Sequence, residues 1–426
     1  MIVRFSVENF RSIREKQELT LVASSLKDRP DSLIRIDQAP HILLPVAAIY
    51  GPNASGKTNV LRALHWMSTA VANSYRRWSP SSPIPHDPFI LDSSRDQPSR
   101  FEVEFIVNSV RYRYGFVTDS EKFREEWLYA YPSGKQQQWF FRNEDPKRIF
   151  TFSRNLRGEK NRTIEELTRP NSLYLSTAAQ NNHEALLPIY NFLTRSICFS
   201  ITRREMSRTE NMCSDEKRKE KLLSLLKAAD LGIEDLRTEE TELDEKNKKV
   251  MFGVISVIKE SMPSSSADIP LPLKTTNIFF RHRGQEGTGN ELKFEDESDG
   301  TRAYFALLGP VIEALESGGV LCVDELESSL HPLLAIELIR LFNERASNPR
   351  GAQMIFSTHD TNLLNSHLLR RDQVWFTEKD GSGATHLYPL SDFRPRKGEN
   401  LERGYLQGRY GAVPFIDDDL TTLSKD

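Results

Sequence analysis

Near the start of the chain, Gly51, Gly56, Lys57 and Thr58 are spaced as G-x-x-x-x-G-K-[ST]. A backbone that curls round phosphates needs glycines, because a side chain there would keep the N–H groups away from the anion. Lys57 supplies a point charge for the outer phosphates, and the hydroxyl of Thr58 is suited to binding Mg²⁺. The spacing therefore predicts a loop that binds the phosphates of a nucleoside triphosphate together with Mg²⁺.

The flanks of this loop have the composition that such a site needs. The apolar run 46–49 precedes the loop and predicts a buried strand, and residues 57–75 have helical composition. The start of that helix offers an anion unpaired N–H groups and the positive end of the helix dipole. Asn53, Ser55 and Asn59 lie within this strand–loop–helix segment, and we expect them to bind the nucleotide as well.

A second apolar run, residues 319–323, ends in Asp324 and Glu325. Carboxylates at the end of a buried strand suit magnesium-dependent nucleotide chemistry. We expect Asp324 to hold the metal together with Thr58, and Glu325 to act in catalysis by polarising the attacking water. Taken alone, an apolar run before two acidic residues is a weak pattern, but here it accompanies a phosphate-binding loop.

Residues 353–360 read QMIFSTHD and predict a strand that delivers His359 at its carboxyl end. Ligands bind at that edge of open α/β sheets, and a histidine there can contact a γ-phosphate or orient water. The alternative is a histidine that only fills the core. Because Ser357, Thr358 and Asp360 make this strand end polar, we favour a catalytic role for His359.

Upstream of the acidic strand, Ser298 and Gly300 precede an apolar helical segment, residues 303–315. A serine, a glycine and a helix N-terminus together can cradle an anion without a lysine. As an isolated pattern this is only a good helix cap. Its meaning depends on its order relative to the other motifs.

The composition is that of an ordinary soluble protein, with 27% charged and 38% hydrophobic residues among 426. The net charge of −3 gives no overall basic field for nucleic acid, although a local patch remains possible. The three cysteines, Cys198, Cys213 and Cys322, have no metal-binding spacing and indicate structural thiols in a reducing compartment. No apolar run reaches the roughly 20 residues of a membrane span and no signal pattern opens the chain, so we expect a cytoplasmic protein.

Away from the motifs, alternating residues predict a β-hairpin of 101–107 with 110–117, inside an antiparallel lobe. Proline- and serine-rich stretches at 79–100 and 261–272 predict connections. The other expected elements are strands at 1–10, 19–23, 126–131, 138–142 and 172–176, helices within 161–200 and 203–249, and a hairpin of 275–283 with 291–295.

The charged segment 215–227 has one apolar side, formed by Leu222, Leu225, Leu226 and Ala229. It is either a coiled-coil arm that binds a partner or a solvated helix on an inserted lobe. The heptad pattern does not continue for the three or four repeats that a coiled coil needs, which favours the solvated helix.

The order of these motifs resembles that of ABC-type ATPase heads, the branch shared by SMC, DNA-repair and OLD-like proteins. More closely, the chain is similar to stand-alone OLD-like ATPases (AAA, P-loop type) of bacterial anti-phage systems of the PARIS and RloA/RloB kind. The motifs that carry this resemblance are NFRSI, YGPNASGKTNVL, ESDGTR, VDELESSLHP, FSTHD and GRYGAVPFI.

This resemblance implies an α/β fold: an ABC-type head with an antiparallel β lobe and a large inserted helical and mixed lobe. Its first half would be residues 1–79, with the phosphate loop, and its second half residues 291–426, with the remaining motifs. Residues 80–290 would form the inserted lobes.

The resemblance also assigns roles to individual residues. Ser298 and Gly300 match the signature motif, 328–331 the D-loop, and His359 the switch histidine. Arg11 would lie near the nucleotide. For the glutamine loop, Gln180 in STAAQNN is a candidate.

The resemblance implies head-to-tail dimers, or higher homo-oligomers of such dimers, because an ABC head cannot close its own site. The Ser298–Gly300 cradle of one protomer would cap the γ-phosphate held by Lys57 of the other. ATP would then join the two protomers, and its hydrolysis or release would separate them.

Three functions follow from the resemblance. The favoured one is an ATPase sensor and scaffold of a two-component anti-phage system, which holds a TOPRIM-like nuclease partner in check until a phage-encoded trigger arrives. The chain itself lacks the carboxylate pattern of such a nuclease after His359. The second is a DNA-repair or chromosome-associated ATPase that binds DNA. The third, a transporter subunit, is disfavoured by the SDG signature and the long insertions, and we expect no membrane partner.

Overall fold

The computed structural model describes residues 1–36, 41–145, 147–156, 158–200, 206–242, 274–284 and 291–414, and the single positions 250 and 253. The connection expected at 261–272, part of the charged segment 203–249 and the end of the GRYGAVPFI motif lie outside the described residues.

A six-stranded sheet lies at the centre of the molecule, in the order β16-β15-β3-β14-β13-β9. Neighbouring strands from β15 to β9 are parallel, and β16 pairs with β15 in the antiparallel direction. The phosphate-loop strand β3 and the acidic strand β13 are therefore separated by β14, which leads to His359. The strand bounds are Val46–Tyr50 (β3), Ile197–Ser200 (β9), Val320–Val323 (β13), Gln353–Ser357 (β14), Val374–Lys379 (β15) and Thr385–Pro389 (β16).

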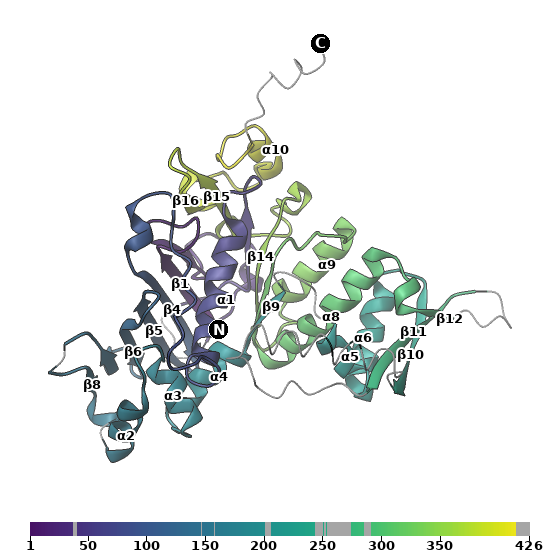
Figure 1. Cartoon of the computed structure of the whole chain (residues 1–426). Coiled ribbons are helices and arrows are strands. Elements are labelled where there is room, and N and C mark those ends of the chain that lie inside the picture. The colour runs from purple at the N-terminus through teal and green to yellow at the C-terminus, as the bar shows by residue number, and fades with distance from the viewer. Residues whose placement is uncertain are drawn as a thin grey trace, which may run out of the picture.

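The two faces of the central sheet pack into two separate cores. In β3, Ala47 and Ile49 face α1 and the antiparallel lobe, whereas Val46, Ala48 and Tyr50 face α8 and α9. Figure 1 shows these two groups on opposite sides of the central strands. Burial on both faces explains why the strand is uniformly apolar rather than alternating.

The antiparallel lobe is a seven-stranded sheet in the order β2-β1-β4-β5-β6-β7-β8. The predicted hairpin is confirmed, since Asn108 and Ser109 have φ of 49° and 61° in the two-residue turn between β4 and β5. The bounds are Ile2–Glu8 (β1), Gln17–Thr20 (β2), Ser99–Val107 (β4), Val110–Thr118 (β5), Phe123–Tyr131 (β6), Gln137–Arg142 (β7) and Phe150–Phe152 (β8).

A third sheet, β10-β11-β12, lies beside α5, α6 and α8 (Figure 1). Its strands are Ile233–Glu242 (β10), Lys274–His282 (β11) and Glu291–Lys293 (β12). The α-helices are Lys57–Asn73 (α1), Glu159–Leu167 (α2), Tyr174–Gln180 (α3), Leu187–Arg195 (α4), Ser207–Met212 (α5), Glu216–Ala228 (α6), Asp299–Ser317 (α8), Pro332–Asn343 (α9) and Leu401–Leu406 (α10). Short 3-10 helices are Pro30–Ser32, Ser93–Asp96, Arg154–Leu156, Phe294–Asp296, Thr361–Leu363, Arg371–Gln373 and Leu390–Phe393.

Two secondary-structure predictions are wrong. The strand expected at 172–176 is the start of helix α3, because the buried carboxylate of Glu126 accepts the N–H groups of Tyr174 and Leu175 at 2.6 and 3.0 Å. The helical stretch expected up to residue 200 ends in strand β9, which pairs with β13. The charged segment 233–242, for which no element was predicted, is strand β10, because it pairs along its length with β11.

The sheets cross the boundaries of the three expected chain segments. Strands β1 and β2, from the first segment, pair within the antiparallel lobe. Strand β9, from the second segment, completes the central sheet, and β12 joins the third segment to β11.

The three cysteines are buried and form no disulfide, as expected of structural thiols. In the part of the chain that the structure describes, no helix is both long and apolar enough to cross a membrane.

Candidate active site

The phosphate loop has glycines where neighbouring strands leave no room for a side chain, in addition to the need for open N–H groups at a phosphate site. Gly51 and Gly56 have φ of 152° and 110°, in the region that favours glycine. A Cβ on Gly51 would lie 2.4 Å from the main-chain oxygen of Thr377, and one on Gly56 would lie 2.2 Å from Oγ1 of Thr385. The loop is thus packed tightly against β15 and the start of β16.

A chain of hydrogen bonds supports the loop from that side. Asn59 Nδ2 donates to Ser12 Oγ at 2.7 Å, Ser12 Oγ lies 2.7 Å from Thr385 Oγ1, and Thr385 Oγ1 donates to the Ser55 carbonyl at 2.8 Å. The Ser55 hydroxyl lies 2.7 Å from Thr377 Oγ1. The side chains of Ser55 and Asn59, predicted to bind the nucleotide, therefore bond to the scaffold that shapes the loop.

Thr385→Val should weaken both the fold and ATP binding. The substitution keeps the shape of the side chain but leaves the Ser55 carbonyl and the Ser12 hydroxyl without their partner, which costs about 1–3 kcal/mol of unfolding free energy. Thr385→Ser keeps the hydroxyl and serves as the control. Denaturant unfolding and ATP titration measure the two effects, and a valine variant as stable and as tight-binding as the serine variant would contradict this role of Thr385.

Lys57 lies where its charge can meet phosphates. Its ammonium donates to the carbonyls of Gly51 and Pro52 at 2.9 and 3.1 Å, and the residue is 5% exposed. Burial lowers the pKa of Lys57, and the carboxylates of Asp324 and Glu325 act against this. Within the described residues, no side chain caps the N-terminus of α1. Its first N–H groups are therefore open to an anion.

The predicted metal ligands lie together although they are 266 positions apart. Thr58 Oγ1 donates to Asp324 Oδ1 at 3.0 Å. Ser357, at the end of β14, donates to the same carboxylate oxygen at 2.5 Å and accepts the N–H of Glu325 at 2.8 Å. Two hard oxygen groups beside a phosphate loop fit Mg²⁺. Ser357 was not predicted to act here, although its place at a polar strand end was a usable signal.

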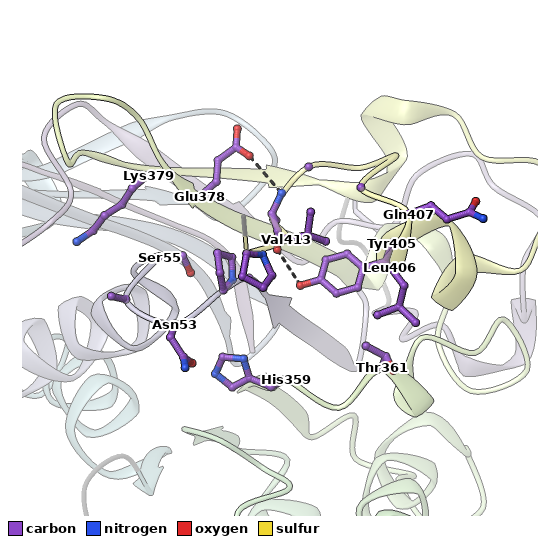
Figure 2. A pocket seen from close by; sticks show the side chains of 17 residues that line it. Asn53, Ser55, His359, Thr361, Glu378, Lys379, Tyr405, Leu406, Gln407 and Val413 are labelled. Carbon is purple, nitrogen blue, oxygen red and sulfur yellow. Dashed lines mark hydrogen bonds between the residues drawn. The ribbon is translucent and has the colours of Figure 1, made fainter. Parts of the chain in front are cut away.

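His359 lies at the wall of a cavity of about 1000 Å³ that the phosphate loop borders. Figure 2 shows Asn53 and His359 close together on one side of this cavity. Partial burial and the ammonium of Lys57 lower the pKa of His359. The imidazole is therefore mostly neutral at pH 7, able to donate from one nitrogen and to accept at the other.

The opposite wall of the cavity is the C-terminal segment 405–414. The Tyr405 hydroxyl donates to the Ala412 carbonyl at 2.8 Å, and the Ala412 N–H donates to Glu378 at 3.2 Å. Most of the GRYGAVPFI motif is therefore part of the surroundings of the phosphate loop.

The signature residues lie at the start of α8. Ser298 caps this helix by accepting the N–H of Thr301 at 3.1 Å. A Cβ on Gly300 would lie 3.0 Å from the carbonyl oxygen of Ser329, so the signature segment packs on the D-loop segment 328–331. Among the described residues, no hydrogen bond joins Ser298 or Gly300 to the phosphate loop of the same chain.

Arg11 and Gln180 are held by other partners. Arg11 forms an ion pair with Asp87 at 2.9 Å. Arg11 lies one position before Ser12, whose hydroxyl supports the phosphate loop. Gln180 donates to Tyr190, whose hydroxyl lies against the carbonyl of Ala72 near the end of α1. Because a helix rises about 1.5 Å per residue, Gln180 lies roughly 20 Å from the phosphate loop and does not belong to this site.

Residues 46–365 match the protein family described as "AAA domain, putative AbiEii toxin, Type IV TA system". The chain belongs to this AAA family. Its mostly parallel central sheet with the phosphate loop after β3, joined to an antiparallel lobe, is a mixed α/β fold consistent with an ATPase of this family. No curated protein matches the chain.

Solved structures similar to this AAA-family chain include SMC head domains. The SMC head domain of Thermotoga maritima is 13% identical with a TM-score of 0.40, and the match covers 91% of this chain and 98% of that one. An SMC head bound to the C-terminal winged-helix domain of ScpA is 11% identical with a TM-score of 0.39, and the match covers 91% of this chain and 96% of that one. The Pyrococcus furiosus SMC head with an extended coiled coil, bound to the C-terminal domain of ScpA, is 12% identical with a TM-score of 0.39, and the match covers 92% of this chain and 97% of that one. Similarities of this size carry no inference about function.

Proposed function

We propose that this chain is a cytoplasmic, Mg²⁺-dependent ATPase that acts as the sensor and scaffold of a two-component anti-phage system. The observation that carries the ATPase part is the contact between Thr58 and Asp324 beside the Lys57 loop. This contact brings a phosphate-binding group and a metal-binding group from distant strands into one site. ATP is the substrate class that uses both.

In this proposal each residue has one task. Lys57 and the N–H groups at the start of α1 hold the β- and γ-phosphates. Thr58 and Asp324 would hold Mg²⁺, which neutralises phosphate charge when bound. Glu325 orients and polarises the attacking water, and His359 contacts the γ-phosphate from the cavity side.

We also propose that two protomers close each site head to tail. Within the part of the chain that the structure describes, Ser298 and Gly300 make no hydrogen bond to their own phosphate loop, while Gly300 is already packed on the D-loop segment. The cradle formed by Ser298 and Gly300 is thus built before any partner arrives. A second copy could present it to the γ-phosphate held by Lys57.

A mixing experiment tests the shared site. Gly300→Asp places a carboxylate in the cradle, and Lys57→Ala removes the phosphate charge, so each variant alone should be inactive. In a mixed dimer one of the two composite sites keeps both intact halves, so mixing should restore a fraction of the ATP turnover. A folded Gly300→Asp protein with full activity would contradict the shared geometry, as would mixtures that recover nothing.

The second component of the proposed system is a TOPRIM-like nuclease that this chain keeps inactive until a phage-encoded protein triggers its release. The description of the AAA family names a toxin of a type IV toxin–antitoxin system, which supports a two-component context with one toxic member. The outer face of α6 carries exposed charges suited to specific association with a partner protein.

Purification from the native operon, followed by infection, tests this role. We expect a stable complex with the product of the neighbouring gene, no toxicity before infection, and loss of protection when Lys57 or Glu325 is substituted. Toxicity of this chain expressed alone would make it the toxic member instead. Recovery with chromosomal DNA only, with a repair defect and unchanged phage survival, would favour the DNA-repair ATPase.

A further inference from the structure

Glu327 lies two positions after the acidic pair Asp324–Glu325 at the end of β13, and its side chain contacts the main chain of His359. The main-chain N–H groups of Glu325 and Leu326 donate to the side-chain and main-chain oxygens of Ser357, at 2.8 and 3.0 Å. The carboxylate of Glu327, the residue after Leu326, accepts a hydrogen bond from the main-chain N–H of His359 at 2.6 Å. The first two residues bind β14 through their main chain, whereas Glu327 uses a charged side chain.

The imidazole of His359 is exposed at the cavity wall, and among the described residues it makes no hydrogen bond (Figure 2). Its position therefore depends on its main chain. A hydrogen bond from an amide to an ionised carboxylate is shorter and stronger than one to a neutral acceptor. Glu327 is thus well suited to fix the residue while leaving its ring free to meet a phosphate.

The second oxygen of Glu327 argues against a purely structural role. Within the described residues, this oxygen is buried and has no hydrogen-bond partner, like the hydroxyl of Tyr50 and one oxygen of Asp360. Burial also raises the pKa of the Tyr50 hydroxyl. An unsatisfied buried oxygen destabilises a fold.

Tyr50 connects the phosphate loop to the C-terminal segment. It is fully buried and immediately precedes Gly51. Its ring packs edge-on against Tyr405 of α10, with centroids 6.0 Å apart. On the other side of the histidine, Thr361 donates to Glu402 of the same helix at 2.9 Å. The loop that carries His359 is thus held between Glu327 and α10.

We propose that Glu327 is a positioning residue, which holds the main chain of His359 so that the imidazole meets the γ-phosphate. This role rests on the proposed ATP hydrolysis. Glu327 touches neither the phosphates nor the attacking water; it acts through the histidine. Its removal should therefore impair turnover and leave nucleotide binding intact.

The test compares Glu327→Ala with Glu327→Gln in the full chain. Alanine removes the acceptor of the His359 N–H, and a displacement of the reacting groups by about 1 Å lowers kcat by up to about 100-fold. Glutamine keeps an acceptor oxygen and should restore most of kcat. ATP affinity and melting temperature should match those of the wild type in both variants. Glu166→Ala, at an exposed position of α2, is the matched control.

The main-chain amide of His359 gives a readout that does not need turnover. In protein labelled with ¹⁵N-histidine, the resonance of His359, assigned by its loss in His359→Gln, should move in Glu327→Ala and stay near its wild-type position in Glu327→Gln.

Several outcomes would overturn the positioning role. Unchanged kcat in Glu327→Ala, equal defects in the alanine and glutamine variants, or parallel losses of stability and ATP affinity would each do so. A wild-type protein that binds ATP but never hydrolyses it would instead overturn the proposed function. The amide resonance would then still report whether Glu327 holds His359.

Discussion

Lys57→Ala should lower ATP affinity by about 10- to 100-fold and abolish every nucleotide-dependent activity of the chain. The ammonium is the one positive charge within the loop, and hydrogen bonds to charged groups contribute about 1.5–3 kcal/mol each. Among the residues that the structure describes, its hydrogen-bond partners are the carbonyls of Gly51 and Pro52, so its removal should leave the fold intact. Calorimetric titration with ATP and Mg²⁺ measures the loss.

Lys217→Ala is the matched control, because Lys217 is an exposed lysine on α6, outside this site. It should bind ATP like the wild type. Melting temperatures of both variants should lie close to that of the wild type. A folded Lys57→Ala protein with near-normal affinity and turnover would exclude the phosphate-loop assignment.

Glu325→Gln should retain ATP binding and lose hydrolysis by about 10²- to 10⁴-fold, the usual contribution of a general base. The change removes the carboxylate that polarises water, whereas Asp324 and Thr58 keep their 3.0 Å contact. The expected product is a closed pair of protomers with trapped ATP. Turnover assays and light scattering with ATP measure the two effects.

The control for this substitution is Glu166→Gln, an exposed carboxylate on α2. It should hydrolyse ATP like the wild type and remain in the same oligomeric state. If Glu325→Gln turns over ATP at the wild-type rate, another group activates the water. If it fails to bind ATP at all, the carboxylate serves the metal rather than the water.

Elements whose pattern is local were predicted well from the sequence. The alternation of 101–117 predicts the β4–β5 hairpin, and the apolar helical segment 303–315 predicts α8. The phosphate-loop motif falls in the same group, because its defining spacing is contained within eight consecutive residues.

Elements decided by distant partners were predicted poorly. The N-terminus of α3 depends on the Glu126 carboxylate, which arrives from β6. Strand β9 is a four-residue apolar run, too short to distinguish from a buried helix by periodicity. The charged strand β10 exists because β11 supplies its hydrogen bonds.

For the candidate site, the sequence by itself determined which residues have the chemistry: Lys57, Thr58, Asp324, Glu325 and His359 all follow from motif and strand-end positions. Only the tertiary structure decided how they are held. Because β14 lies between β3 and β13, a serine at its end can bond to Asp324 while Asp324 bonds to Thr58. The order of strands in a sheet is set by packing of the whole chain, so the supporting residues carry no local signal that would reveal their partners.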